Sequence, residues 1–348
     1  MSDLLIRNGL IVDGSGQESF QADLLIRGGK IFKIGSDLKS ENCEILEASG
    51  LVVIPGIIDG HSHTERTIFR NPYSDSKLFQ GVTSEVICQC GEGAFPLPED
   101  LEKRNAFSHL WTGAYSGSSS VNGPSWTDFA SYAEALADLK PAVNLLPVVP
   151  HGALRAFVMG WEERLATEPE RKKLQKALAE NLSQGAWGIS FGLEYPPSSY
   201  SDQLELLALA QTIASCGGVC AFHLRNEDNE LLESIDEVLG LGKVTGAPIH
   251  ICHLKADGKP NWGKAIEGLE KIRQSRTEGV RATVDQYPYD AFSTQLSLLI
   301  GGWAQSGGRE AFLARLSDPN LRERIENEVK QNIDLRGGPG RIQISQTN

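Results

Sequence analysis

The feature that most constrains the fold of this chain is an alternation of short apolar segments with longer amphipathic ones from Val52 onward. This rhythm is typical of βα units arranged around a parallel sheet. Seven segments are predicted to be strands: 52–59, 83–90, 143–150, 186–193, 219–224, 248–253 and 281–286. Apolar residues at three- and four-residue steps predict helices over 168–184, 201–215, 228–245 and 261–277, with one more over 308–333.

Polar residues follow most of these predicted strands, which favours a (β/α)8 TIM-like barrel over an open sheet. In such barrels the active site lies at the C-terminal ends of the strands. Because about seven strands can be counted, we expect an incomplete α/β barrel over residues 53–348. Residues 91–140 are too many for a simple βα connection, so we expect this insert to shape a substrate site.

Residues 1–52 have a different pattern, with short β-rich runs separated by glycine, asparagine and aspartate. The pattern predicts a small antiparallel sheet that forms its own subdomain. We expect this sheet to be part of a composite β-sandwich.

The overall charge limits the kinds of partner that this chain can bind. The chain has 33 basic and 45 acidic residues, for a net charge of −12, which argues against nucleic acid as a partner. No apolar run approaches the roughly 20 residues that span a bilayer. Residues 1–7 lack the basic and apolar regions of a signal peptide, so we expect a cytoplasmic protein without a membrane partner.

Histidine and cysteine side chains, which can bind metals, recur where the predicted strands end. His61 and His63 follow the first strand, Cys90 ends the second, and His223 and His253 end the fifth and sixth. A barrel would bring these ends together. Nitrogen and sulfur are the ligands that zinc favours, and a thiolate can bridge two metals. The sequence therefore predicts a metal site at this end of the barrel.

Several motifs in chain order give a more specific resemblance. Asp59-Gly60-His61-Ser62-His63 resembles the first-strand motif of the amidohydrolase superfamily. The other motifs resemble the N-acyl-D-amino-acid deacylase (D-aminoacylase) family: Cys90-Gly91, His151-Gly152-Ala153-Leu154-Arg155, Gly192-Leu193-Glu194-Tyr195-Pro196-Pro197, His223-Leu224-Arg225, His253-Leu254-Lys255-Ala256 and Tyr287-Pro288-Tyr289.

This resemblance implies roles for individual residues. Cys90, His223 and His253 would hold a tightly bound Zn²⁺, and His61 and His63 would contribute to a second, weaker site. A further set would lie near an N-acyl amino acid substrate: His151, Arg155, Tyr195, Arg225, Lys255, Tyr287 and Ser293. A lysine or arginine two residues past a metal ligand can pair with a substrate carboxylate.

The implied reaction is zinc-dependent hydrolysis of N-acyl-D-amino acids to a carboxylate and a D-amino acid. The family uses an aspartate in a Ser-Asp-Gly type motif on strand eight as its proton carrier, and no such motif occurs here. The resemblance therefore implies a C-terminally truncated enzyme with no catalytic acid, with weak or no turnover and limited stability.

Two alternatives remain open from the sequence. One is a cyclic-amide hydrolase of the hydantoinase or dihydroorotase kind, although residues 187–193 lack the lysine that bridges the metals of those enzymes. The other is a non-catalytic metal-binding fragment.

Overall fold

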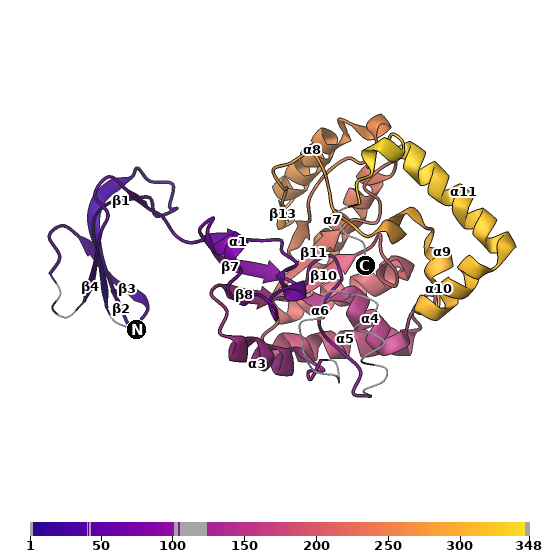
Figure 1. The fold of residues 1–348 in the computed structure, drawn as a ribbon, viewed down its shortest axis with the longest axis horizontal. Helices are drawn as coiled ribbons and strands as arrows, with labels where there is room; N and C mark the ends of the chain where they lie inside the picture. Colours follow the sequence, from indigo (N-terminus) through magenta and orange to yellow (C-terminus); the bar gives the residue numbers. More distant parts are fainter. Residues whose placement is uncertain (1–2, 40, 42, 101–103, 105–123, 345–348) are drawn as a thin grey trace. The chain divides into compact units, whose positions relative to one another are not determined.

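Parallel strands alternating with helices make up most of the computed structural model of this protein (Figure 1). The structure describes residues 3–344 except residues 40, 42, 101–103 and 105–123. Much of the predicted insert at 91–140 therefore lies outside the described residues. The chain divides into two units, Met1–Ile57 and Ile58–Asn348.

The first unit is a five-stranded sheet built around β1, with order β3-β2-β1-β4 and with β5 also paired to β1. Its strands are β1 (Leu4–Ile11), β2 (Phe20–Arg27), β3 (Lys30–Gly35), β4 (Glu44–Glu47) and β5 (Val52–Val53). The predicted antiparallel pairing is found between β1, β2 and β3, but the sheet as a whole is mixed, because β4 and β5 run parallel to β1. The buried carboxylate of Asp23 accepts backbone hydrogen bonds from Asn8 and Leu38 and so ties β2 to the segment that leads back to β4.

The second unit contains the predicted alternation. Its strands are β6 (Ile57–Asp59), β7 (Val82–Ile87), β8 (Asn144–Pro147), β9 (Val149–Pro150), β10 (Gly188–Gly192), β11 (Val219–His223), β12 (Ile249–Ile251) and β13 (Ala282–Val284). They pair as β6-β7-β8 and as β9-β10-β11-β12-β13. The single segment predicted over 143–150 is divided into β8 and β9, since Pro147 and Pro150 cannot donate ladder hydrogen bonds.

Helices follow the strands on the outside of this unit (Figure 1). The longer ones are α3 (Phe129–Leu139), α4 (His151–Met159), α5 (Glu168–Ser183), α6 (Gln203–Cys216), α7 (Leu231–Thr245), α8 (Lys264–Thr277), α10 (Gly308–Ser317) and α11 (Pro319–Leu335), and the short ones are α1 (Asp75–Leu78) and α9 (Gly302–Gln305). Consecutive helices pack together, α5 on α6, α6 on α7 and α7 on α8. Buried side chains such as Phe191, Phe222 and Ile249 fill one core with them.

The single helix predicted over 308–333 is wrong, because the chain breaks between α10 and α11 at Asp318. Pro319 has no N–H to continue α10, but it is well suited to the first turn of a new helix. The Asp318 side chain accepts hydrogen bonds from the backbone N–H of Asn320 and Leu321 and caps α11. Among the helices that the structure describes, none has both the length and the apolar character of a bilayer-spanning segment.

Candidate metal centre

His61 and His63 lie in the turn that follows β6, and their rings are 5.6 Å apart. Between them, Ser62 donates a backbone hydrogen bond to Val86 and a side-chain hydrogen bond of 2.6 Å to the buried carboxylate of Glu85. This anchor places both imidazoles beside β7. The preceding Asp59 pairs with Lys77.

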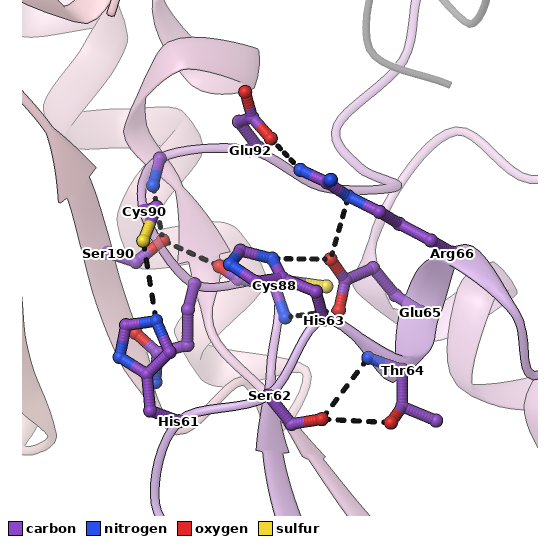
Figure 2. Close-up of polar contacts among 12 residues, drawn as sticks. His61, Ser62, His63, Thr64, Glu65, Arg66, Cys88, Cys90, Glu92 and Ser190 are labelled. Carbon is purple, nitrogen blue, oxygen red and sulfur yellow. Dashed lines mark hydrogen bonds and ion pairs between the residues drawn. The ribbon is translucent and has the colours of Figure 1, made fainter. Parts of the chain in front are cut away.

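Cys90 is held by an unusual turn after β7. Cys88, Cys90 and Gly91 all have positive φ angles, so the strand has ended before the thiol is reached. The Ser190 hydroxyl accepts a hydrogen bond from the Gly91 N–H and donates one to the Cys88 carbonyl, which joins this turn to β10 (Figure 2). The Cys90 backbone also packs directly on Gly192, where an added Cβ would lie 1.9 Å from the Cys90 carbonyl oxygen.

The four predicted histidine ligands converge on the sulfur of the fifth, Cys90. Its Sγ lies 3.4 Å from His61 Nε2 and 3.5 Å from His253 Nε2. His63 and His223 interact with the same sulfur, and the His223 and His253 rings are 4.6 Å apart. Residues from the ends of β6, β7, β11 and β12 thus form one cluster, as a barrel requires.

Each of these histidines has a carboxylate on one ring nitrogen. The four pairs are His61 Nδ1 with Asp285 at 3.2 Å, His63 Nδ1 with Glu65 at 3.2 Å, His253 Nδ1 with Glu227 at 3.0 Å, and His223 Nε2 with Glu194 at 2.9 Å. Histidine ligands of metals almost always donate their second ring N–H to such a partner. The buried Nδ1 of His223 makes no hydrogen bond within the described residues, which suits an atom that holds a metal.

The charges of the cluster match its geometry. Burial by itself raises the pKa of the Cys90 thiol, yet His61, His223 and His253 hold that pKa well below its usual value. Burial favours neutral His223, but Glu227, Cys90 and Glu194 outweigh it and raise its pKa to about 10. A thiolate surrounded by imidazoles is a donor set that fits Zn²⁺.

Two residues from the predicted substrate set border this cluster. The ammonium group of Lys255 pairs with Glu227 and lies 3.3 Å from His253 Nδ1. The Tyr195 ring packs against His223 with 4.6 Å between centroids, and its hydroxyl lies 2.9 Å from the Thr294 hydroxyl. Tyr195 is therefore tied to the segment that also holds Ser293.

Tyr287 and Ser293 lie in the segment after β13. Tyr287 stacks on Tyr289 with ring centroids 4.9 Å apart. Burial raises the pKa of Tyr287, and the charge of Glu227 raises it further, which places Tyr287 within the electrostatic reach of the cluster. Ser293 is exposed, between Phe292, whose ring faces Lys255, and Thr294.

The structure gives His151 and Arg155 a different place from the predicted one. Both side chains are fully buried. His151 bonds Ser198 and Glu205, while Arg155 pairs with Glu205 and donates to the carbonyl of Pro197. Their polar atoms are thus already used inside the protein, and contact with a substrate stays a prediction.

Arg225 is likewise engaged away from the cluster. Its guanidinium group forms an ion pair with Glu237 at 3.0 Å and donates to the carbonyl of Ser199. Its role near a substrate carboxylate stays a prediction, since Lys255, the other candidate, is paired with a carboxylate as well.

Sequence reasoning missed the carboxylates that hold the histidines. Asp285 is the last but one residue of the strand predicted over 281–286. Glu65 follows His63 by two residues, and Glu227 follows His223 by four. An acid at a strand end or just past a histidine was the available signal. Their pairing with particular ring nitrogens depends on contacts across the barrel.

A cavity of about 320 Å³ adjoins the cluster. Its wall includes Glu194 and Tyr195, which also contact His223. Trp161, Leu298 and Phe312 give it an apolar side. The volume is in the range of small-molecule sites, which are about 300–1,000 Å³.

Solved structures share this architecture. An N-acyl-D-glutamate deacylase from Bordetella bronchiseptica, complexed with zinc and a phosphonate mimic of the tetrahedral intermediate, has a TM-score of 0.75 and 32% identity, covering 83% of this chain and 59% of that one. An L-hydantoinase from Arthrobacter aurescens has a TM-score of 0.53 at 18% identity, covering 82% of this chain and 58% of that one, and indicates the fold alone. Fold and cluster define this chain as part of an amidohydrolase barrel, so the predicted fold class is confirmed.

Sequence comparison gives the family. The chain is 34% identical to an N-acyl-D-glutamate deacylase and 33% identical to a D-aminoacylase, both from Alcaligenes xylosoxydans xylosoxydans, over 84% of its length. No family model matches the chain. It spans 58% and 59% of the lengths of these two relatives. The chain belongs to the N-acyl-D-amino-acid deacylase (D-aminoacylase) family, which confirms the predicted resemblance.

Proposed function

We propose that this chain carries the metal centre of a zinc-dependent hydrolase that cleaves the amide bond of N-acyl-D-amino acids, releasing a carboxylate and a D-amino acid. The observation that carries the proposal is the convergence of His61, His63, His223 and His253 on the Cys90 sulfur. The substrate class comes from the relatives, which are an N-acyl-D-glutamate deacylase, a D-aminoacylase and an N-acyl-D-aspartate deacylase.

We assign the tight zinc site to Cys90, His223 and His253, and a weaker second site to His61 and His63. Bound zinc supplies Lewis-acid chemistry, because it polarises an amide carbonyl and acidifies water. The protein itself positions the side chains that bind the metal. The carboxylates of Glu227 and Glu194 orient two of the rings.

We assign recognition of the substrate carboxylate to Lys255. Its ammonium group lies beside a metal ligand, where it can form a charge-assisted hydrogen bond with a carboxylate. Tyr195, Tyr287 and Ser293 would complete the substrate site. The cavity beside Tyr195 offers apolar surface to the acyl group or the amino-acid side chain.

The sequence of β10, the fourth strand predicted for the barrel, is less consistent with a hydrolase of cyclic amides than with a deacylase. Hydantoinases and dihydroorotases bridge their metals with a carbamylated lysine, and β10, Gly188–Gly192, contains no lysine. Ser190 stands in that strand and is used to hold the Cys90 turn.

The test combines metal analysis, hydrolysis and ligand binding on the full chain. We expect bound zinc after dialysis. Because the chain lacks the Ser-Asp-Gly type motif of the family, we expect at most slow release of D-amino acid from N-acetyl-D-glutamate, N-acetyl-D-aspartate or N-acetyl-D-methionine, and none from the L-isomers. A phosphonate analogue of an N-acyl-D-amino acid should stabilise the zinc-loaded chain against heat, and Lys255→Met should remove that effect. Glu278→Gln, in a surface ion pair with Lys243, is the matched control.

The outcomes separate the candidate functions. Bound zinc without turnover and without phosphonate binding would indicate a non-catalytic metal-binding protein. Hydrolysis of hydantoins or dihydroorotate, with no action on linear amides, would replace the proposal by the cyclic-amide alternative.

A further inference from the structure

His151, Ser198 and Glu205 form a buried chain of hydrogen bonds that the proposed reaction does not use. His151 Nδ1 lies 2.5 Å from the Ser198 hydroxyl oxygen, and His151 Nε2 lies 2.8 Å from a carboxylate oxygen of Glu205. Burial lowers the pKa of His151 and outweighs the effect of Glu205, so the ring is neutral. Because a carboxylate only accepts hydrogen bonds, Nε2 carries the ring proton and Nδ1 accepts one from the Ser198 hydroxyl.

Arg155, one turn further along α4, holds the same segment. Its guanidinium group donates to the carbonyl oxygens of Pro197 at 3.0 Å and Tyr200 at 3.3 Å. The Glu205 carboxylate accepts from Arg155 Nε as well as from His151. Every nitrogen and oxygen atom of the His151, Arg155 and Glu205 side chains therefore has a partner. A buried polar network that is satisfied in this way is rigid.

The turn held by this network carries two residues that contact His223. A carboxylate oxygen of Glu194 lies 2.9 Å from His223 Nε2, and the Tyr195 and His223 rings are 4.6 Å apart. The backbone N–H of Ser199 donates to the carbonyl of Tyr195 at 2.9 Å. A shift of Ser198 therefore moves the backbone of Tyr195 and the groups that contact the His223 ring.

The first turn of α4 also contacts the turn that holds the Cys90 sulfur. The backbone N–H of Gly152, the residue after His151, donates to the carbonyl of Gly91 at 3.0 Å. Gly91 follows Cys90 directly in the chain. One end of α4 is thus bonded both to the Cys90 turn and to residues 197–200.

We infer that His151, Ser198 and Glu205 are positioning residues of the metal centre, a role that rests on the proposed function. They keep the Cys90 turn and the turn at residues 194–200 at a fixed separation. The Cys90 sulfur and the His223 ring are thereby held ready for one ion. The three residues act through Glu194 and Tyr195 and not as ligands.

Ser198→Ala tests this role with a small change, because it removes one hydroxyl group and adds no volume. We expect the same zinc stoichiometry with about tenfold lower affinity, as is usual when a residue that orients a metal ligand is replaced. Competition with a chromogenic chelator measures the affinity. The visible absorption of the cobalt(II)-loaded chain, which depends on ligand geometry, should change as well. His151→Leu should have a larger effect of the same kind.

Asn181→Leu is the matched control for a loss of stability alone. Asn181 is buried in α5, where its side chain accepts from the backbone N–H of Phe129 and donates to the carbonyl of Ala177. These bonds join α5 to the start of α3 and do not involve the residues of the metal centre. We expect Asn181→Leu to lower the midpoint of denaturant unfolding and to keep the zinc affinity and the cobalt spectrum of the unmodified chain.

The outcomes separate this role from the proposed function. Unaltered zinc affinity and cobalt spectrum in Ser198→Ala would overturn the positioning role and leave the zinc centre in place. An equal loss of affinity in Ser198→Ala and Asn181→Leu would also overturn it, because overall stability would then set the affinity. An unmodified chain that binds no zinc tightly would overturn the proposed function together with this role.

Discussion

Glu227 and His253 form a contact that joins the metal centre to the substrate site. A carboxylate oxygen of Glu227 lies 3.0 Å from His253 Nδ1, while His253 Nε2 faces the Cys90 sulfur at 3.5 Å. The same carboxylate pairs with Lys255. Burial disfavours the charged carboxylate, but His223 and Lys255 outweigh it and hold the pKa of Glu227 at about 2. One buried anion therefore orients a ligand and the proposed substrate-binding ammonium.

Replacing this anion should weaken metal binding. We expect Glu227→Gln to lower zinc affinity by about 10- to 100-fold, because His253 loses the carboxylate that sets its ring orientation and basicity. Competition with a chromogenic chelator measures the change. Glu278→Gln removes a surface carboxylate and should leave affinity unaltered; equal affinities in all three proteins would show that Glu227 has no part in holding the ligand.

Zinc uptake should release protons. Burial opposes protonation of the histidines, but Cys252 and Cys90 raise the pKa of His61, and Cys90 and Glu65 raise that of His63. Glu227, Cys90 and Glu194 raise the pKa of His223 to about 10. His223 is therefore charged in the metal-free protein at neutral pH and must deprotonate to bind zinc. Zinc affinity should rise with pH up to about pH 10.

Calorimetry in buffers of different ionisation enthalpy counts these protons directly. We expect net proton release on zinc binding near pH 7. Binding that is independent of both pH and buffer would be incompatible with a charged His223 in the metal-free centre.

We expect Arg155 to contribute to the free energy of unfolding. Arg155→Met leaves the Glu205 carboxylate buried with one cation fewer, and breaking a buried pair costs about 3–5 kcal/mol of unfolding free energy. Denaturant unfolding measures the loss, and Glu205→Leu in the same chain should recover part of it. Normal stability together with lost phosphonate binding would instead restore the substrate role predicted from the sequence.

Gly192 should be intolerant of a side chain. Gly192→Ala places a Cβ against the Cys90 carbonyl, which is backbone and cannot rotate away, so we expect a loss of about 1–3 kcal/mol together with weaker zinc binding. Gly240 in α7 is the matched control, since its added Cβ would meet nothing within 4 Å. Gly240→Ala should raise stability by roughly 0.5–1 kcal/mol. Equal effects of the two variants on zinc binding would argue against a fixed Cys90 turn.

The alternation of strands and helices could be predicted from the sequence because each βα unit has its own local periodicity. Convergence of His223 and His253 followed from the barrel, since strand ends meet wherever the loops run. The contacts of the motif at His151 to Arg155 could not be predicted in this way. A polar motif after a strand looks the same whether it lines a pocket or pairs with a buried Glu205 that lies 50 residues further along the chain.

The local backbone geometry of the site could not be predicted from the sequence as the strands and helices could. Strand alternation does not reveal the positive φ angles at Cys90 and His253, two of the proposed zinc ligands. Likewise, the direction of β4 depends on how the chain returns past β1, which short β-rich runs do not encode.

The proposed zinc centre depends most directly on two ligands, Cys90 and His223. Zinc retained after exhaustive dialysis, counted by mass spectrometry for the unmodified chain, Cys90→Ala, His223→Ala and the control Cys220→Ala, tests this claim. We predict tightly bound zinc in the unmodified chain and the control and its loss in both ligand variants, with all four chains folded by circular dichroism. Unchanged zinc content in Cys90→Ala or His223→Ala would contradict the metal centre described above.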